Sequence, residues 1–114
     1  MRTTKEIGDT GEGLAADYLV GQGYKIIKRN YRTPFGEIDI IALDKDTLVF
    51  VEVKKKTGDG FGAPAEMITP RKIGKIRRTA ECYILEKELK NLLWRIDAVL
   101  IDGAKVELLR NITG

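Results

Sequence analysis

The segment that decides the fold runs from Glu37 to Lys54, with the sequence E-I-D-I-I-A-L-D-K-D-T-L-V-F-V-E-V-K. Its two runs of β-branched and apolar residues, 37–43 and 47–54, are separated only by the polar spacer 44–46. Such runs predict β-strands, and a spacer this short joins antiparallel neighbours. The segment therefore predicts a β-hairpin.

The predicted hairpin gathers charged side chains on one face. Alternation along a strand puts Glu37 and Asp39 on one side, and likewise Glu52 and Lys54. If the hairpin folds about a Lys45-Asp46 tip, Asp39 lies across from Glu52 and Glu37 across from Lys54. Directly opposed residues have Cβ atoms about 4.5–5.5 Å apart. Two carboxylates that close repel each other unless a cation lies between them or one is protonated.

Such a pair of carboxylates is the arrangement that a metal-dependent hydrolase needs. We expect Asp39 and Glu52 to bind a divalent metal, which activates water and polarises a phosphoryl oxygen. Lys54 would orient that water or stabilise the charge that grows on the phosphate. The chain has no histidine and a single cysteine, Cys82. The ligands would therefore be oxygen atoms, which favour Mg²⁺ or Mn²⁺.

A structural interpretation of the same residues is also open. Glu37 and Lys54 can form an ordinary cross-strand ion pair, Asp39 can cap a turn, and E-x-K is a short motif that occurs often by chance. Glu52, however, lies within the apolar run V-F-V-E-V. An unpaired charge there is costly, which favours a functional reason for it.

Basic residues are concentrated after the second strand of the hairpin. Positions 54–78 hold eight basic and two acidic residues, a net of +6, whereas the whole chain has a net charge of +3. Such a local excess predicts a surface for a polyanion, nucleic acid above all, although a solvated helix face has the same composition. The residues expected to contact nucleic acid are Lys55, Lys56, Arg71, Lys72, Lys75 and Arg78.

Outside the hairpin, the sequence predicts two helices and three further strands. Helical spacing of apolar residues predicts helices over 4–21 and from Thr69-Pro70 to near Lys90. Strands are expected over 24–31, 93–101 and 105–109, which gives the order αβββαββ, a mixed sheet flanked by helices in a single domain, 1–114. The glycine-rich loop 57–64 offers Phe61 either as a mobile gate or as a ring packed under its own loop. Asp97, on a separate strand, is expected to be structural.

Cysteine content and hydropathy favour a cytoplasmic protein. A lone cysteine cannot close an intramolecular disulfide, as suits a reducing compartment. The polar N-terminus has no signal-peptide core, and no apolar run approaches the ~20 residues that span a bilayer.

Five blocks of the sequence carry a resemblance to a known family. They are G-E-G-L-A-A-D-Y-L, G-Y-K-I-I-K-R-N-Y, G-E-I-D-I-I-A, L-V-F-V-E-V-K and R-I-D-A-V. In order and spacing they resemble the YraN family of small bacterial proteins. That family is similar in turn to the PD-(D/E)XK nuclease superfamily, including the archaeal Holliday junction resolvases.

The resemblance implies a restriction-endonuclease-like fold and assigns roles to residues. Asp39 matches the superfamily's aspartate, and Glu52-Val53-Lys54 matches its (D/E)-X-K. Glu12 matches an acidic residue that resolvase-like members place near the metal, and its flanking glycines allow close approach. Glu37 is expected to support the site by orienting Lys54.

Three departures leave substrate specificity open. Ile38 replaces the superfamily's proline, Lys55-Lys56 stands where relatives often have an arginine, and a glutamine after the lysine is not evident. The leading hypothesis is a Mg²⁺- or Mn²⁺-dependent endonuclease, with DNA favoured over RNA and branched or damaged DNA among its candidate substrates. The alternative is a non-catalytic module that binds nucleic acid on a nuclease-like scaffold. A homodimer is open, since cutters of branched DNA often act as two-fold dimers.

Overall fold

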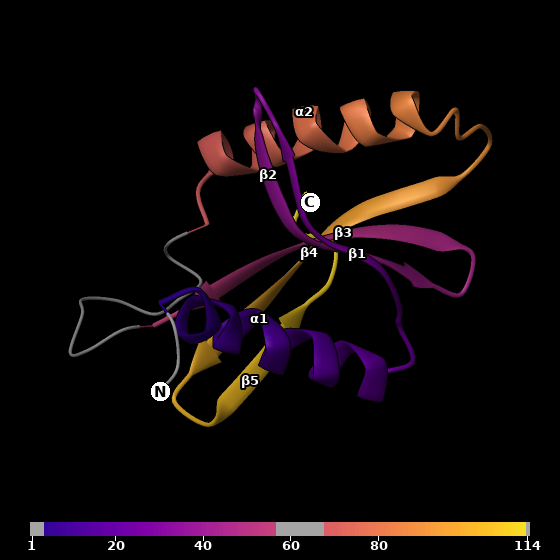
Figure 1. Ribbon diagram of the computed structural model, residues 1–114. Coiled ribbons are helices and arrows are strands. Elements are labelled where there is room, and N and C mark those ends of the chain that lie inside the picture. The colour runs from indigo at the N-terminus through magenta and orange to yellow at the C-terminus, as the bar shows by residue number, and fades with distance from the viewer. Residues whose placement is uncertain (1–3, 57–67, 114) are drawn as a thin grey trace.

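The computed structural model describes residues 4–56 and 68–113, and it has seven elements within those ranges (Figure 1). They are α1 (Thr4–Gly21), β1 (Lys25–Thr33), β2 (Gly36–Asp44), β3 (Thr47–Lys55), α2 (Pro70–Glu86), β4 (Leu93–Asp102) and β5 (Lys105–Leu109). The predicted order αβββαββ is confirmed. The loop 57–64, with Phe61, lies outside the described residues.

The five strands form one mixed sheet in chain order, β1-β2-β3-β4-β5. Only β3 and β4 are parallel, and the other neighbours are antiparallel. A parallel pair needs a crossover connection, and here the connection contains α2. This helix begins as expected, because the Lys72 backbone N–H donates to the Thr69 side chain (3.2 Å) ahead of Pro70.

The two helices cover opposite faces of the sheet, with α1 below it and α2 above it in Figure 1. The alternation of β3 supplies both cores, because Val49 and Val51 pack in the cluster of α1, whereas Leu48 and Phe50 pack in the cluster of α2. Both faces of the strand are therefore apolar, as a central strand requires. In the described part of the chain, neither helix is long and apolar enough to cross a membrane.

The β2–β3 hairpin has the predicted register, but it opens earlier than expected. Pairing runs from Asp44 opposite Thr47 to Ile40 opposite Val51 and stops there. Beyond that point β2 stays with β1, down to Gly36. The direct ladder pairing expected of Asp39 with Glu52 and of Glu37 with Lys54 is therefore wrong.

A local twist of β2 explains the opening. Ile38 and Ile40 should share a face, yet Ile38 packs in the core of α2 and Ile40 in the core of α1. Tyr31, the neighbour of Ile38 on β1, makes an edge-to-face contact with Tyr83 (5.2 Å between ring centroids) and donates a hydrogen bond to Glu86 (2.8 Å). The end of the β1–β2 hairpin thus packs against α2 and is no longer paired with β3.

Candidate active site

A cavity lies beside the point where β2 and β3 separate. It has a volume of about 260 Å³ and lies between the start of β2, the end of β3 and the first turns of α2. Glu52 and Lys54 belong to its lining because both lie on the α2 face of β3, like Phe50. The charged residues of the lining are Glu37, Glu52, Lys54, Lys72 and Lys75.

Asp39 occupies the first unpaired position of β2. Its Oδ2 accepts a hydrogen bond from the Val53 backbone N–H (2.7 Å), so the carboxylate bridges the gap that the ladder has left. Burial, and then the negative charge of Glu52, raises the pKa of Asp39 to about 6, although hydrogen bonds from Val53 and with Glu12 oppose the shift. The structure thus places Asp39 and Glu52 close enough to repel each other in a partly desolvated site.

Glu52 and Lys54 form an ion pair with 3.5 Å between Lys54 Nζ and Glu52 Oε1. Both side chains are largely shielded, with 14% and 21% of their surfaces exposed. Burial raises the pKa of Glu52, whereas the charge of Lys54 lowers it. The lysine therefore holds the second carboxylate in its charged form beside the first.

Glu12 reaches the site from α1. It forms an ion pair with Arg29 on β1 (3.7 Å) and a hydrogen bond with Asp39. The close approach expected of its flanking glycines is not needed, because a Cβ at Gly13 would meet nothing within 4 Å and one at Gly11 would make an ordinary contact at 3.7 Å. No sequence pattern points to Arg29 as a site residue, because it lies 17 positions after Glu12 on a different element.

Glu37 lines the cavity but does not have the partner that we expected. Its carboxylate forms an ion pair with Arg32 on β1 (3.4 Å), and both side chains are well exposed. The expected orientation of Lys54 by Glu37 depended on the direct cross-strand pairing, which ends at Ile40. Glu52 is the ion-pair partner of Lys54 instead.

The predicted basic residues divide into three groups. Lys72 and Lys75 line the cavity, and Lys75 also lines a second hollow of about 320 Å³ with Arg71 and Arg78. The other two point elsewhere, because Lys56 forms an ion pair with Asp102 (3.9 Å) and Lys55 lies beside Gly11 of α1.

Lys72 is closer to Lys54 than the sequence indicated. A hydrogen bond with Lys54, followed by burial, lowers the pKa of Lys72. Two amines in contact repel each other when both are charged. An anion between them, such as a phosphate oxygen, would relieve that repulsion.

The donor atoms fit a hard divalent cation whose coordination shell is completed by the substrate. Within residues 4–56 and 68–113, no three acidic, histidine or cysteine side chains gather closely enough to hold a metal ion by themselves. Asp39 and Glu52 nevertheless supply two neighbouring carboxylates. Mg²⁺ commonly binds through one or two carboxylates together with water and substrate phosphates. The residues present therefore fit Mg²⁺ or Mn²⁺ bound with a phosphodiester.

The raised pKa of Asp39 predicts that the site destabilises the metal-free fold. The folded protein holds this proton up to about pH 6, whereas the ordinary pKa is 3.8. The protonated carboxyl group therefore stabilises the fold fully below pH 3.8, and this stability is lost as the pH rises through about 6. Asp39→Asn should raise the free energy of unfolding by about 1–3 kcal/mol at pH 8 and by much less at pH 4.

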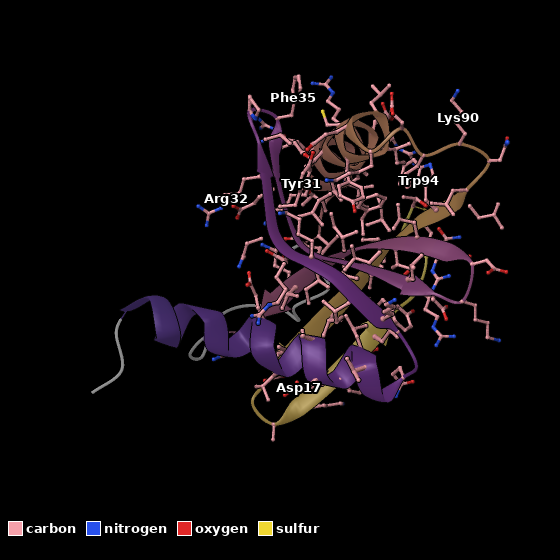
Figure 2. All side chains as sticks on the ribbon, turned by 45° about the vertical axis from the view of Figure 1, so that its right-hand side comes forward. Asp17, Tyr31, Arg32, Phe35, Lys90 and Trp94 are labelled. Carbon is pink, nitrogen blue, oxygen red and sulfur yellow. The ribbon has the colours of Figure 1, made fainter. Side chains whose placement is uncertain are left out.

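Urea denaturation of the metal-free protein at the two pH values measures this effect. The matched control is Asp17→Asn, an exposed carboxylate on α1 (Figure 2), which should change stability by less than about 0.5 kcal/mol. Equal stability of parent and Asp39→Asn at pH 8 would show that Asp39 is not desolvated.

Comparison with known proteins identifies the family. The model of the family described as "Uncharacterised protein family UPF0102" matches residues 11–101, which include every residue of the cavity lining and Glu12. The chain belongs to this family. It is the YraN family that the sequence resembles.

Relatives in distant bacteria match along nearly the whole chain. A UPF0102 protein of Dehalococcoides mccartyi is 46% identical over 114 residues, covering 96% of this chain and 94% of its own. One from Clostridium botulinum is 45% identical, covering 94% and 93%, and one from Persephonella marina is 42% identical, covering 91% and 90%.

Proposed function

We propose that this UPF0102 protein is a Mg²⁺- or Mn²⁺-dependent endonuclease that hydrolyses phosphodiester bonds in DNA. The observation that carries the proposal is the meeting of Asp39, Glu52 and Lys54 where β2 and β3 separate. Strands rarely open inside a sheet without a reason, since unpaired backbone groups are costly. Here the opening brings the Asp39 carboxylate close to Glu52 and Lys54, which line the cavity.

Each residue has a distinct task in this mechanism. Asp39 and Glu52 would hold the cation, which when bound activates water and neutralises phosphate charge. Lys54, held by Glu52, presents its ammonium to the attacking water or to the phosphate oxygens. Lys72, from α2, brings a second amine beside Lys54 in the cavity lining. Glu12 forms an ion pair with Arg29 and a hydrogen bond with Asp39, which keeps Asp39 in place.

The positive face of α2 favours nucleic acid as the substrate. Arg71, Lys75 and Arg78 line the hollow next to the cavity, where they would bind backbone phosphates on either side of the cleaved bond. DNA is favoured over RNA through the resemblance to DNA resolvases, and branched or damaged DNA belongs to the substrates to be tested. A homodimer would serve a branched substrate with two symmetric strands.

The α2 surface gives a prediction about salt dependence. The double variant Arg71→Ala, Arg78→Ala should weaken DNA binding and reduce the slope of log affinity against log salt by about 2, one for each lost phosphate contact. Fluorescence anisotropy with a labelled oligonucleotide between low and moderate NaCl measures the slope. Lys87→Ala, Lys90→Ala is the control, because it removes the same charge from exposed positions after the helix. An unchanged slope in the first variant would place the phosphates elsewhere.

Metal binding and cleavage together test the proposal. Calorimetry should detect Mn²⁺ binding by the parent and none by the double variant Asp39→Ala, Glu52→Ala. The parent should also cut at least one member of a panel of duplex, single-stranded, forked and four-way-junction DNA in Mg²⁺ or Mn²⁺, and not in EDTA. A parent that binds DNA but cuts none of these, while the double variant binds it equally well, would contradict the proposal.

A non-catalytic nucleic-acid-binding module is the second candidate. It is favoured by one observation, namely that no three acidic, histidine or cysteine side chains among the described residues gather closely enough to hold a cation by themselves. This module would bind DNA with a steep salt dependence that is indifferent to metal and to Asp39.

A further inference from the structure

The tip of the β1–β2 hairpin carries a large apolar side chain in an unusual place. Phe35 is 54% exposed, and it lies at the end of the hairpin that rises past α2 (Figures 1 and 2). A single exposed phenylalanine is ordinary. This one differs because its turn is held rigidly and because it borders the candidate active site.

The turn is fixed by its own hydrogen bonds and by α2. The Thr33 hydroxyl accepts from the Phe35 N–H (3.1 Å) and donates to the Gly36 carbonyl (3.2 Å). Gly36 has a φ of 152°, and a Cβ there would lie only 3.3 Å from the buried Thr79 hydroxyl. Glycine is therefore required at this position, and the hairpin is seated on the helix. The backbone that carries the Phe35 ring is thus held in one conformation.

The hollow at this tip and the cavity of the candidate active site have lining residues in common. The hollow around Phe35 is also lined by Gly36 and Glu37, and both residues line the cavity of Glu52 and Lys54 as well. On its other side, that cavity shares Lys75 with the basic hollow of α2. An aromatic platform, an acidic centre and a cationic hollow thus adjoin one another.

We propose that Phe35 is a stacking platform for an unpaired base, so that the protein prefers DNA in which a single strand enters the site, such as a fork or a flap. Aromatic rings bind bases of any sequence by stacking, whereas the paired bases of a duplex do not offer a free face. Arg32, exposed beside the tip and paired with Glu37, supplies a cation for the adjoining phosphate.

The geometry also limits where that base lies. Asp39 lies four positions after Phe35, which at about 3.3 Å per residue is a distance of at most about 13 Å. A stacked strand advances about 3.4 Å per nucleotide. The stacked base therefore lies within about four nucleotides of the phosphate at the acidic centre. The inference rests on the proposed function for the position of the cut, but the stacking itself requires no cleavage.

Binding in EDTA tests the platform separately from catalysis. Oligonucleotides with 2-aminopurine at successive positions, as single strands, forks and full duplexes, are titrated with the parent, Phe35→Ala, Phe35→Trp and Leu85→Ala. Leu85 is the control because it is 78% exposed near the far end of α2. Phe35→Ala should weaken binding of forks and single strands roughly tenfold, leave duplex binding within about twofold and abolish the fluorescence quenching at one position. Phe35→Trp should restore both, and Leu85→Ala should match the parent.

Two results would overturn the platform. Equal loss of duplex and single-strand binding in Phe35→Ala would mean a general structural effect. Unchanged affinity for every oligonucleotide would mean that Phe35 does not bind DNA bases, and its exposed ring would then fit a protein partner. Quenching that depends on Phe35 in a protein that never cuts DNA would instead support the platform and contradict only the endonuclease.

Discussion

Replacing Lys54 by methionine should lower the rate of DNA cleavage by about 10²–10³-fold without abolishing Mn²⁺ binding. Methionine keeps the apolar stem and removes the ammonium, which lies 3.5 Å from Glu52 in a shielded site. Removal of one charged group that stabilises a transition state commonly has an effect of this size. The two carboxylates that would bind the cation remain.

The measurement is single-turnover cleavage with saturating protein, together with Mn²⁺ calorimetry. Both are made at pH 8, because Lys54 lowers the pKa of Glu52 and its loss will raise that pKa further. The control is Lys56→Met, whose side chain forms an ion pair with Asp102 and should leave cleavage within about twofold of the parent. A Lys54→Met protein that cuts DNA at the parental rate would reduce Lys54 to a structural partner of Glu52.

The hairpin shows what the sequence could predict about this site and what it could not. Strand alternation and the short spacer correctly predicted the register from Asp44–Thr47 to Ile40–Val51, because both are local properties of the chain. The opening beyond Ile40 depends on the contact of Tyr31 with Tyr83, two residues 52 positions apart. No local pattern encodes such a contact.

The same limit applies to the cations around the site. The sequence predicted a basic segment, yet it treated Lys55, Lys56 and Lys72 alike. The structure separates them, because strand alternation turns Lys55 toward α1, and the crossover to α2 returns Lys72 to Lys54. Whether a lysine faces the cavity or packs against another part of the protein depends on that crossover. The composition of the segment does not determine it.

Asp97→Ala should be the most destabilising single change outside the apolar core, at about 3–5 kcal/mol. The carboxylate is fully buried and accepts hydrogen bonds from the Tyr24 hydroxyl (2.7 Å), the Arg95 guanidinium (2.9 Å) and the Asn111 backbone N–H (2.9 Å). Alanine would leave these donors without their acceptor and the Arg95 charge with Asp44 alone. A domain of this size has a total stability of about 5–15 kcal/mol, so the loss is a large part of it.

Urea denaturation and a DNA cleavage assay at low temperature separate a structural role of Asp97 from a catalytic one. We expect the midpoint of unfolding to fall sharply while the folded fraction cuts DNA at close to the parental rate, because Asp97 holds β1, β4 and the C-terminal segment together away from the cavity lining. Asp102→Ala, on the same strand but 56% exposed, should cost less than about 1 kcal/mol. If Asp97→Ala kept its stability and lost cleavage, the site would have to include β4, and the two-carboxylate centre of β2 and β3 would be incomplete.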